Sequence, residues 1–264
     1  MDNDDKPIGK ILSRRDALKL LGVGGAAFLA ACAAPDVLTN TPIPTLTEVL
    51  QATSTPLSST TAATAIPACI VLPELTEGPY FVDEKLDRSD IRSDPSDGSI
   101  KEGLPLQLTF RVSQINNSCT PLAGAAVDIW HCDAMGIYSD ASDPGFNTIG
   151  KKFLRGYQVT DANGVAQFTT IYPGWYQGRA VHIHFKIRAD APGGGIYDFT
   201  SQLFFDDSVS DMVYTQEPYS SKPGVRSPRN EGDGIFQQSG GQLTLRPTQT
   251  TEGYAAVFDI GLQI

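Results

Sequence analysis

The hydrophobic positions between residues 106 and 262 fall into short runs, in which apolar residues alternate with polar ones or follow one another directly. Gly, Pro, Asn and Asp separate these runs, which is typical of strands joined by turns. No long stretch has the spacing of an amphipathic helix. The pattern therefore predicts an all-β fold, an antiparallel β-sandwich with long loops and little helix. The predicted strands are Leu106–Val112, Ala126–Cys132, Gly156–Thr160, Val165–Ile171, Val181–Ile187, Phe199–Phe205 and Tyr254–Leu262.

Three other segments have a different pattern. Asp161-Ala162-Asn163-Gly164 lies between two predicted strands and indicates a hairpin turn. Residues 206–240 are polar and rich in Gly, Ser and Pro, with one or two helical turns expected at Val209–Tyr214. Residues 33–66 are rich in Thr, Ser, Pro and Ala and contain no Lys or Arg, a composition that cannot bury enough apolar surface to fold. We expect a flexible stalk at residues 32–67 and a single domain at residues 68–264.

The N-terminus has the features of an export signal. Ser13-Arg14-Arg15-Asp16 is a twin-arginine (Tat) pattern, and an apolar stretch that is too short for a membrane anchor follows it. The stretch ends at Leu29-Ala30-Ala31-Cys32, which resembles the lipobox of bacterial lipoproteins. We expect residues 1–31 to be a signal peptide and Cys32 to be lipidated, so that the protein is exported to the cell surface or periplasm, with release from the membrane as an alternative outcome. The alternative is an amphipathic start to a cytosolic helix.

The overall composition limits the partners. Hydrophobic residues make up 41% of the chain and charged residues 19%, which is ordinary for a globular protein. The net charge is −10, so a nucleic-acid-binding surface is not expected. No uncharged apolar run reaches the roughly 18 residues needed to span a bilayer. We therefore expect membrane contact only through the lipidated Cys32.

Three cysteines remain after Cys32, and outside the cytoplasm two of them can pair. Cys69 lies at the start of the domain, and Cys119 lies in a polar turn. Cys132 lies within an apolar strand pattern. These positions predict a Cys69–Cys119 disulfide and a buried free thiol at Cys132.

Two of the three histidines, His182 and His184, lie two residues apart on a predicted strand, so their imidazoles point to the same face. Such a pair alone is more often structural than metal-binding. However, Pro173-Gly174 forms a turn just before Tyr176, and Gly136 forms one just before Tyr138. Two tyrosines and two histidines would make a mixed oxygen and nitrogen site.

Ferric iron suits this set of donors best, because a trivalent ion lowers the pKa of a phenol and binds the phenolate. The usual Fe(II) site would need a carboxylate, and none lies between Tyr172 and Arg188. Zinc would more often take Cys or a third His. The residues therefore predict one Fe(III) ion per domain.

With these features in order, the chain resembles the intradiol catechol ring-cleavage dioxygenases, which include the catechol 1,2-dioxygenases and the protocatechuate 3,4-dioxygenase subunits. The resemblance covers about residues 72–205, and its motifs are Thr76-Glu77-Gly78-Pro79-Tyr80-Phe81, Gly124–His131, Gly136-Ile137-Tyr138-Ser139, Arg155-Gly156, Thr160–Gly164, Pro173-Gly174-Trp175-Tyr176, Gly178-Arg179, His182-Ile183-His184-Phe185 and Thr200-Ser201-Gln202. By position, it implies that Tyr138, Tyr176, His182 and His184 bind the iron, and that Tyr176 is the axial tyrosinate that leaves when substrate binds.

The resemblance also implies the reaction and the roles of other residues. A catechol-type diol and O2 would give a ring-opened cis,cis-muconate-type acid by cleavage between the two hydroxyl-bearing carbons. Arg179 would stabilise negative charge on the bound ring, with a surface salt bridge as its alternative role. Pro79, Tyr80 and Gln202 would line the substrate pocket or serve only in packing. His131 is expected to be structural rather than a ligand.

The chain departs from the familiar members of this family in three ways. The helical N-terminal domain through which the bacterial catechol dioxygenases dimerise is replaced by the predicted stalk. The loop from Tyr176 to His182 is short, and an export signal is present. These departures leave open the ring substituents of the substrate and the oligomeric state, monomer or small homo-oligomer.

Two other functions compete with this one. Gly124–Val127, Thr160–Gly164 and Pro173–Tyr176 also resemble transthyretin-like sandwich domains, which share the core topology and often act as binding modules at cell surfaces. Such a module does not need two tyrosines and two histidines to converge. A copper or zinc hydrolase would need a carboxylate base near the His pair, and the sequence offers none there.

Overall fold

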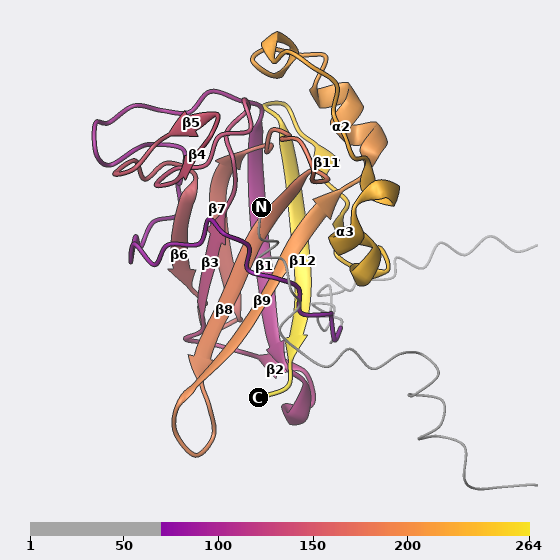
Figure 1. The fold of residues 1–264 in the computed structure, drawn as a ribbon. Coiled ribbons are helices and arrows are strands. Elements are labelled where there is room, and N and C mark those ends of the chain that lie inside the picture. The colour runs from indigo at the N-terminus through magenta and orange to yellow at the C-terminus, as the bar shows by residue number, and fades with distance from the viewer. Residues whose placement is uncertain (1–69) are drawn as a thin grey trace, which may run out of the picture. The chain divides into compact units, whose positions relative to one another are not determined.

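The computed structural model describes residues 70–264, which form two β-sheets that pack face to face (Figure 1). We call the sheet that contains His182 and His184 the histidine sheet, and the other the β1 sheet. The histidine sheet has the order β10 (Thr244–Leu245), β9 (Ile196–Phe205), β8 (His182–Asp190), β3 (Ala126–Trp130) and β6 (Arg155–Val159). The β1 sheet has the order β11 (Thr248–Gln249), β12 (Tyr254–Leu262), β1 (Pro105–Gln114) and β2 (Thr120–Pro121), and β7 (Val165–Ile171) also pairs with β1. A small separate hairpin contains β4 (Ser142–Asp143) and β5 (Phe146–Asn147).

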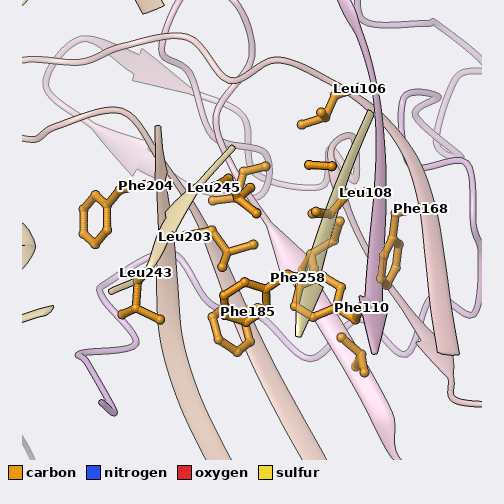
Figure 2. Packing of buried hydrophobic residues seen from close by; sticks show 14 of the residues in the cluster. Leu106, Leu108, Phe110, Phe168, Phe185, Leu203, Phe204, Leu243, Leu245 and Phe258 are labelled. Carbon is orange, nitrogen blue, oxygen red and sulfur yellow. The ribbon is translucent and has the colours of Figure 1, made fainter. Parts of the chain in front are cut away.

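All the strands predicted from the sequence are present, and the all-β sandwich is confirmed. The alternation that predicted them has the expected cause, because the apolar side chains of each strand point into the space between the sheets. Phe110 of β1 contacts Phe185 of β8 and Phe258 of β12, with ring centroids 5.4 and 5.6 Å away. Figure 2 shows these rings among the buried leucines of both sheets. This core supports both sheets.

Three details of the topology differ from the antiparallel prediction, and the first is that β10 pairs with β9 in parallel. β1 and β12, which lie near the two ends of the domain, pair in parallel along their whole length. No short turn joins them, so nothing local in the sequence fixes their direction. Residues 161–164 do form a turn, with Gly164 N–H donating to Asp161 O at 2.9 Å, but it connects β6 of one sheet to β7 of the other. It is a corner between sheets and not a hairpin, because β6 continues along β3 and β7 along β1.

Residues 206–240 contain more helix than predicted. The expected turns at Val209–Tyr214 are confirmed as α2 (Asp207–Val213), which is capped by Asp206. A second helix, α3 (Gly234–Ser239), was not predicted, and Asp233 caps it by accepting hydrogen bonds from Ile235 N and Phe236 N. Short 3-10 turns lie at Ile115–Asn117, Tyr219–Ser221 and Asn230–Gly232. None of the helices in residues 70–264 is long and apolar enough to span a bilayer.

The cysteines can be placed only in part. Cys119 is disulfide-bonded, and Cys132 is a buried free thiol that lies just after β3 rather than inside it. Cys69 and Cys32 lie outside the described residues, as do the predicted signal peptide and stalk. The pairing of Cys119 with Cys69 therefore stays a prediction.

Candidate metal centre

The two faces of β8 have different roles. Ile183 and Phe185 point into the core between the sheets, so His182 and His184 point to the outer face of the histidine sheet. The segment that follows residue 70 crosses this face (Figure 1), and Leu75 N–H donates to Thr200 O of β9 at 3.0 Å. The histidines are consequently buried even though they lie outside the core, with exposed fractions of 2% and 1%.

The structure brings the four predicted ligands together. The Nε2 atoms of His182 and His184 are 3.0 Å apart. The hydroxyl oxygens of Tyr138 and Tyr176 lie 3.4 and 3.3 Å from Nε2 of His182. Tyr138 is fully buried and Tyr176 is half-buried. Two nitrogen and two oxygen donors thus converge on one small volume.

Two loops present the tyrosines, and their backbones pack directly against each other. In the first loop, Asp133 Oδ1 accepts hydrogen bonds from Met135 N at 2.9 Å and Ile137 N at 3.0 Å, which shapes the turn before Tyr138. A Cβ atom on Gly136 would overlap the carbonyl oxygen of Trp175, and one on Gly174 would overlap that of Asp133. Glycine at both positions is what allows the two loops to approach.

A hydrogen bond fixes which ring nitrogen of His182 carries the proton. Nδ1–H donates to Ala180 O at 2.7 Å, so Nε2 is unprotonated and its lone pair is available on the side of the other three predicted ligands. Burial and the nearby Arg179 cation lower the pKa of His182 to about 3, and burial and His182 lower that of His184 well below its usual value. Both imidazoles are therefore neutral at pH 7, as metal binding requires.

The surroundings of the two tyrosines determine when they can become phenolates. Burial raises the pKa of both Tyr138 and Tyr176. The Arg179 cation opposes this effect, but the pKa of both phenols stays above its ordinary value. A phenolate would form there only if a strong cation lay among the four donors. The donor set therefore fits a trivalent ion that accepts phenolate ligands, and fits zinc poorly.

Comparison with known proteins agrees with this geometry. Residues 76–221, more than half of the chain, match the family described as dioxygenase (Dioxygenase_C). The structure is similar to an intradiol ring-cleavage dioxygenase from Tetranychus urticae, with 32% identity, a TM-score of 0.63, and coverage of 74% of this chain and 95% of that one. The chain belongs to the intradiol ring-cleavage dioxygenases.

Two further relatives of this intradiol dioxygenase are bacterial. The dioxygenase domain of a carbohydrate-binding fusion protein from Streptomyces sp. SirexAA-E is 29% identical, with a TM-score of 0.51 and coverage of 74% of this chain and 99% of that one. A chlorocatechol 1,2-dioxygenase from Pseudomonas putida is 32% identical over an alignment of 103 positions that covers 32% of this chain and 36% of that enzyme. The chain therefore spans only about a third of this curated relative.

Arg179 lies beside the four donors of the dioxygenase and is held from two sides. Its Nε donates to Asp233 Oδ2 at 2.9 Å, and its Nη2 donates to Gln202 Oε1 at 2.6 Å. Asp233 is 2% exposed, so this ion pair is not the surface salt bridge considered as an alternative. Gln202 is fully buried, and its Nε2 donates to Thr76 O at 2.8 Å. The predicted pocket residue Gln202 thus orients Arg179.

Asp233 is a site residue that the sequence interpretation missed. Its Oδ2 accepts from Arg179 and from Ala180 N at 2.6 Å, while its Oδ1 caps α3. Burial alone would raise the pKa of Asp233, but Arg179 and these backbone donors lower it on balance, so it is ionised. An Asp followed by Gly-Ile-Phe is a helix N-cap pattern, which could have located α3 but not its contact with Arg179.

The neighbouring residues Pro79 and Tyr80 lie in different environments. Tyr80 stacks on Tyr138 with ring centroids 4.4 Å apart and an interplanar angle of 23°, and its hydroxyl donates to the Asp143 carboxylate. Pro79 is exposed. Tyr80 therefore belongs to the walls of the candidate site through its contact with a predicted ligand.

The third histidine has no free nitrogen. His131 Nδ1–H donates to Cys132 O at 2.8 Å, and its Nε2 accepts from Thr170 Oγ1 at 2.7 Å. Both contacts are buried, and the one with Thr170 joins the end of β3 to β7 of the other sheet. His131 is structural, as the sequence predicted.

Proposed function

We propose that this protein is an Fe(III)-dependent intradiol dioxygenase of a catechol-type aromatic diol. It adds both atoms of O2 to the substrate and breaks the ring between the two hydroxyl-bearing carbons, which gives a cis,cis-muconate-type diacid. The observation that carries the proposal is the convergence of Tyr138, Tyr176, His182 and His184 in a member of this family. A transthyretin-like binding module has no use for such a cluster.

The four converging side chains are the residues that would hold the ion. When bound, the ferric ion supplies a Lewis acid that accepts the oxygens of the diol and an electron acceptor for the electron-rich ring. The two neutral imidazoles provide nitrogen lone pairs without adding charge, and the two phenolates favour the ferric state.

Tyr176 and Arg179 would act on the substrate. Tyr176, the less buried of the two tyrosines, is suited to take up a phenolic proton of the diol at its hydroxyl oxygen. Arg179 places a fixed positive charge near all four donors, where it stabilises negative charge on the ring. Because Asp233 and Gln202 hold the guanidinium in place, it does not need to reorient during the reaction.

Two features of the proposal come from the sequence and from the relatives. The relatives are named for catechol and chlorocatechol, which supports an aromatic diol as substrate and leaves its ring substituents open. The twin-arginine pattern and Cys32 support export as a bacterial lipoprotein, with membrane contact only through the lipid.

The proposal is tested on the purified protein. A tyrosinate bound to Fe(III) absorbs visible light, so the protein expressed with ample iron should be coloured, and its spectrum should change when a catechol is added without oxygen. With oxygen, one O2 should be consumed for each ring-opened diacid formed. A colourless protein that holds zinc would contradict the proposal, as would the yellow semialdehyde that extradiol cleavage produces.

Variants separate the roles of the residues. His182→Ala and His184→Ala should lose iron, because each removes a donor atom, whereas the buried control His131→Gln should retain it. Tyr176→Phe should keep part of the iron but shift the absorption band and slow turnover. Arg179→Ala should keep iron and colour and lose about 10²- to 10³-fold in kcat, the usual effect of removing one charge-stabilising donor. Iron content and steady-state rates measure these outcomes.

A further inference from the structure

Arg155 is a buried cation for which the mechanism above has no use. It is the first residue of β6 and is only 3% exposed. Across the histidine sheet it pairs with Trp130, which pairs with His184, which in turn pairs with Gln202. Because directly opposite residues project from the same face, Arg155 belongs to the row of outer-face side chains that contains a predicted iron ligand.

The guanidinium of Arg155 joins the two segments that carry Tyr80 and Tyr138. Its Nε donates to Ser139 Oγ at 2.7 Å, and its Nη2 donates to the carbonyl oxygen of Ser139, the residue directly after Tyr138. Its Nη1 donates to the carbonyl oxygen of Tyr80 at 3.3 Å. Ser139 is itself buried, and its Oγ donates to Phe153 O at 2.6 Å. One planar group thus fixes the backbone beside both rings of the Tyr80–Tyr138 stack.

The acceptors of Arg155 are unusual for a buried arginine. Within residues 70–264, none of the ion pairs includes Arg155, so its hydrogen bonds go to neutral oxygens. Asp140 and Glu84 act on Arg155 only through longer-range charge interactions, and a guanidinium buried without a direct ion pair is costly to the fold. A side chain that served only to hold the loops together could do so with a neutral amide.

We propose that Arg155 is a positioning residue of the iron centre, which fixes the Tyr138 phenolate through Ser139 and through the stacked ring of Tyr80. This inference rests on the proposed function, because it assigns Tyr138 to the iron. In this arrangement Arg155 does not contact the substrate. Without these hydrogen bonds, the Tyr80–Tyr138 stack and the backbone alone would position Tyr138 less firmly.

The test compares Arg155→Lys and Ser139→Ala with the wild type. Lysine keeps the positive charge but not the planar fork that reaches Ser139 and Tyr80 together. Ser139→Ala removes one acceptor and leaves Arg155 unchanged. The control is Arg111→Lys, because Arg111 donates to Asp259 of β12 in the β1 sheet, away from Ser139, Tyr80 and Arg155.

Three measurements are made on each variant: iron affinity by titration of the metal-free protein, near-ultraviolet circular dichroism of the metal-free protein, and the wavelength of the visible band after loading. Arg155→Lys should lower iron affinity by about 10- to 100-fold, the usual effect of removing a group that orients a ligand, and should shift the band. Ser139→Ala should change both in the same direction by less. Arg111→Lys should change only the melting temperature.

The outcomes separate this inference from the proposed function. If wild-type protein binds no iron and shows no visible band, the proposed function fails, and the inference fails with it. If the wild type is coloured while Arg155→Lys and Ser139→Ala keep its affinity, band and tyrosine dichroism, Arg155 is purely structural and only the inference is overturned. If Arg155→Lys does not fold, the result for Ser139→Ala decides.

Discussion

The three histidines show how single hydrogen bonds decide what a residue can do. His131 uses both ring nitrogens, on Cys132 O and Thr170 Oγ1. His182 uses only Nδ1, and its Nε2 faces the other donors. Nδ1 of His184 has no partner among residues 70–264, and its ring is instead held by stacking on Trp130, 5.0 Å away and nearly parallel. The histidine with no free nitrogen is the one outside the site.

The environment of His131 predicts an acid-sensitive fold. Burial lowers its pKa from 6.5 to about 4, so between these values the unfolded chain binds a proton that the folded chain does not. Stability therefore falls as pH falls through this window, by about 3 kcal/mol for this group alone. Urea unfolding of the metal-free protein at pH 7.5 and pH 4 should show that His131→Gln loses about that much less than the wild type. Equal losses would mean that His131 is protonated in the folded protein.

At the scale of elements, the sequence predicted the strands well and their partners less well. Alternation at Phe110, Ile183 and Phe185 reports which face of a strand is buried, and that is a local property. The parallel pairing of β1 with β12 and the sheet crossing at residues 161–164 depend on residues distant in sequence.

The same limit applies to the site. His182, His184 and the tyrosines that follow glycine turns have local signals, and the structure brings all four together. Asp233 contacts Arg179 from 54 positions away, and Arg155 contacts the carbonyl oxygen of Tyr80 from 75 positions away. Spacing along the chain carries no information about such contacts, because the fold alone creates them.

The contact between the two tyrosine-bearing loops predicts a specific intolerance. Gly174→Ala adds a methyl group against the carbonyl oxygens of Asp133 and Ala134, which are backbone atoms that cannot rotate away. We expect a loss of about 1–3 kcal/mol in stability and weaker iron binding, because the loops must separate. Gly145→Ala is the matched control, since its Cβ would meet nothing within 4 Å. Chemical denaturation and iron titration of both variants test this, and equal behaviour would rule out a role for the loop contact.

At the scale of the whole molecule, the predicted Cys69–Cys119 disulfide would connect the described domain to the residue just before it. Cys119 is disulfide-bonded and Cys132 is free, which leaves Cys32 and Cys69. Because Cys32 is predicted to carry the lipid, the predicted partner is Cys69. A bridge that closes a loop of about 50 residues is worth about 4 kcal/mol by the chain-entropy estimate. Peptide mapping without reduction should recover a Cys69–Cys119 fragment, and reduction should lower the denaturation midpoint. A fragment that joins Cys119 to another cysteine would show that the assignment is wrong.

Export also concerns the whole molecule, and one residue tests it. If Cys32 carries the lipid, Cys32→Ala should move the protein from the membrane fraction to the soluble fraction, because the chain is acidic and has no affinity for anionic lipid. Cys132→Ala is the control, since that thiol is buried in the domain. Membrane fractionation of Cys32→Ala that matches the wild type, in cells that process lipoproteins, would exclude this anchor.

The outer-face position of the metal centre has a consequence for how such proteins diverge. On β8, Ile183 and Phe185 pack in the core, while His182 and His184 belong to the candidate metal centre. Neighbouring residues of one strand are therefore under separate selective pressures. Most of what covers the centre comes from loops, including the turns before Tyr138 and Tyr176. Mutations in these loops can reshape the space above the four converging side chains without altering a single core side chain. A lineage can therefore explore new aromatic substrates while it inherits the same sandwich.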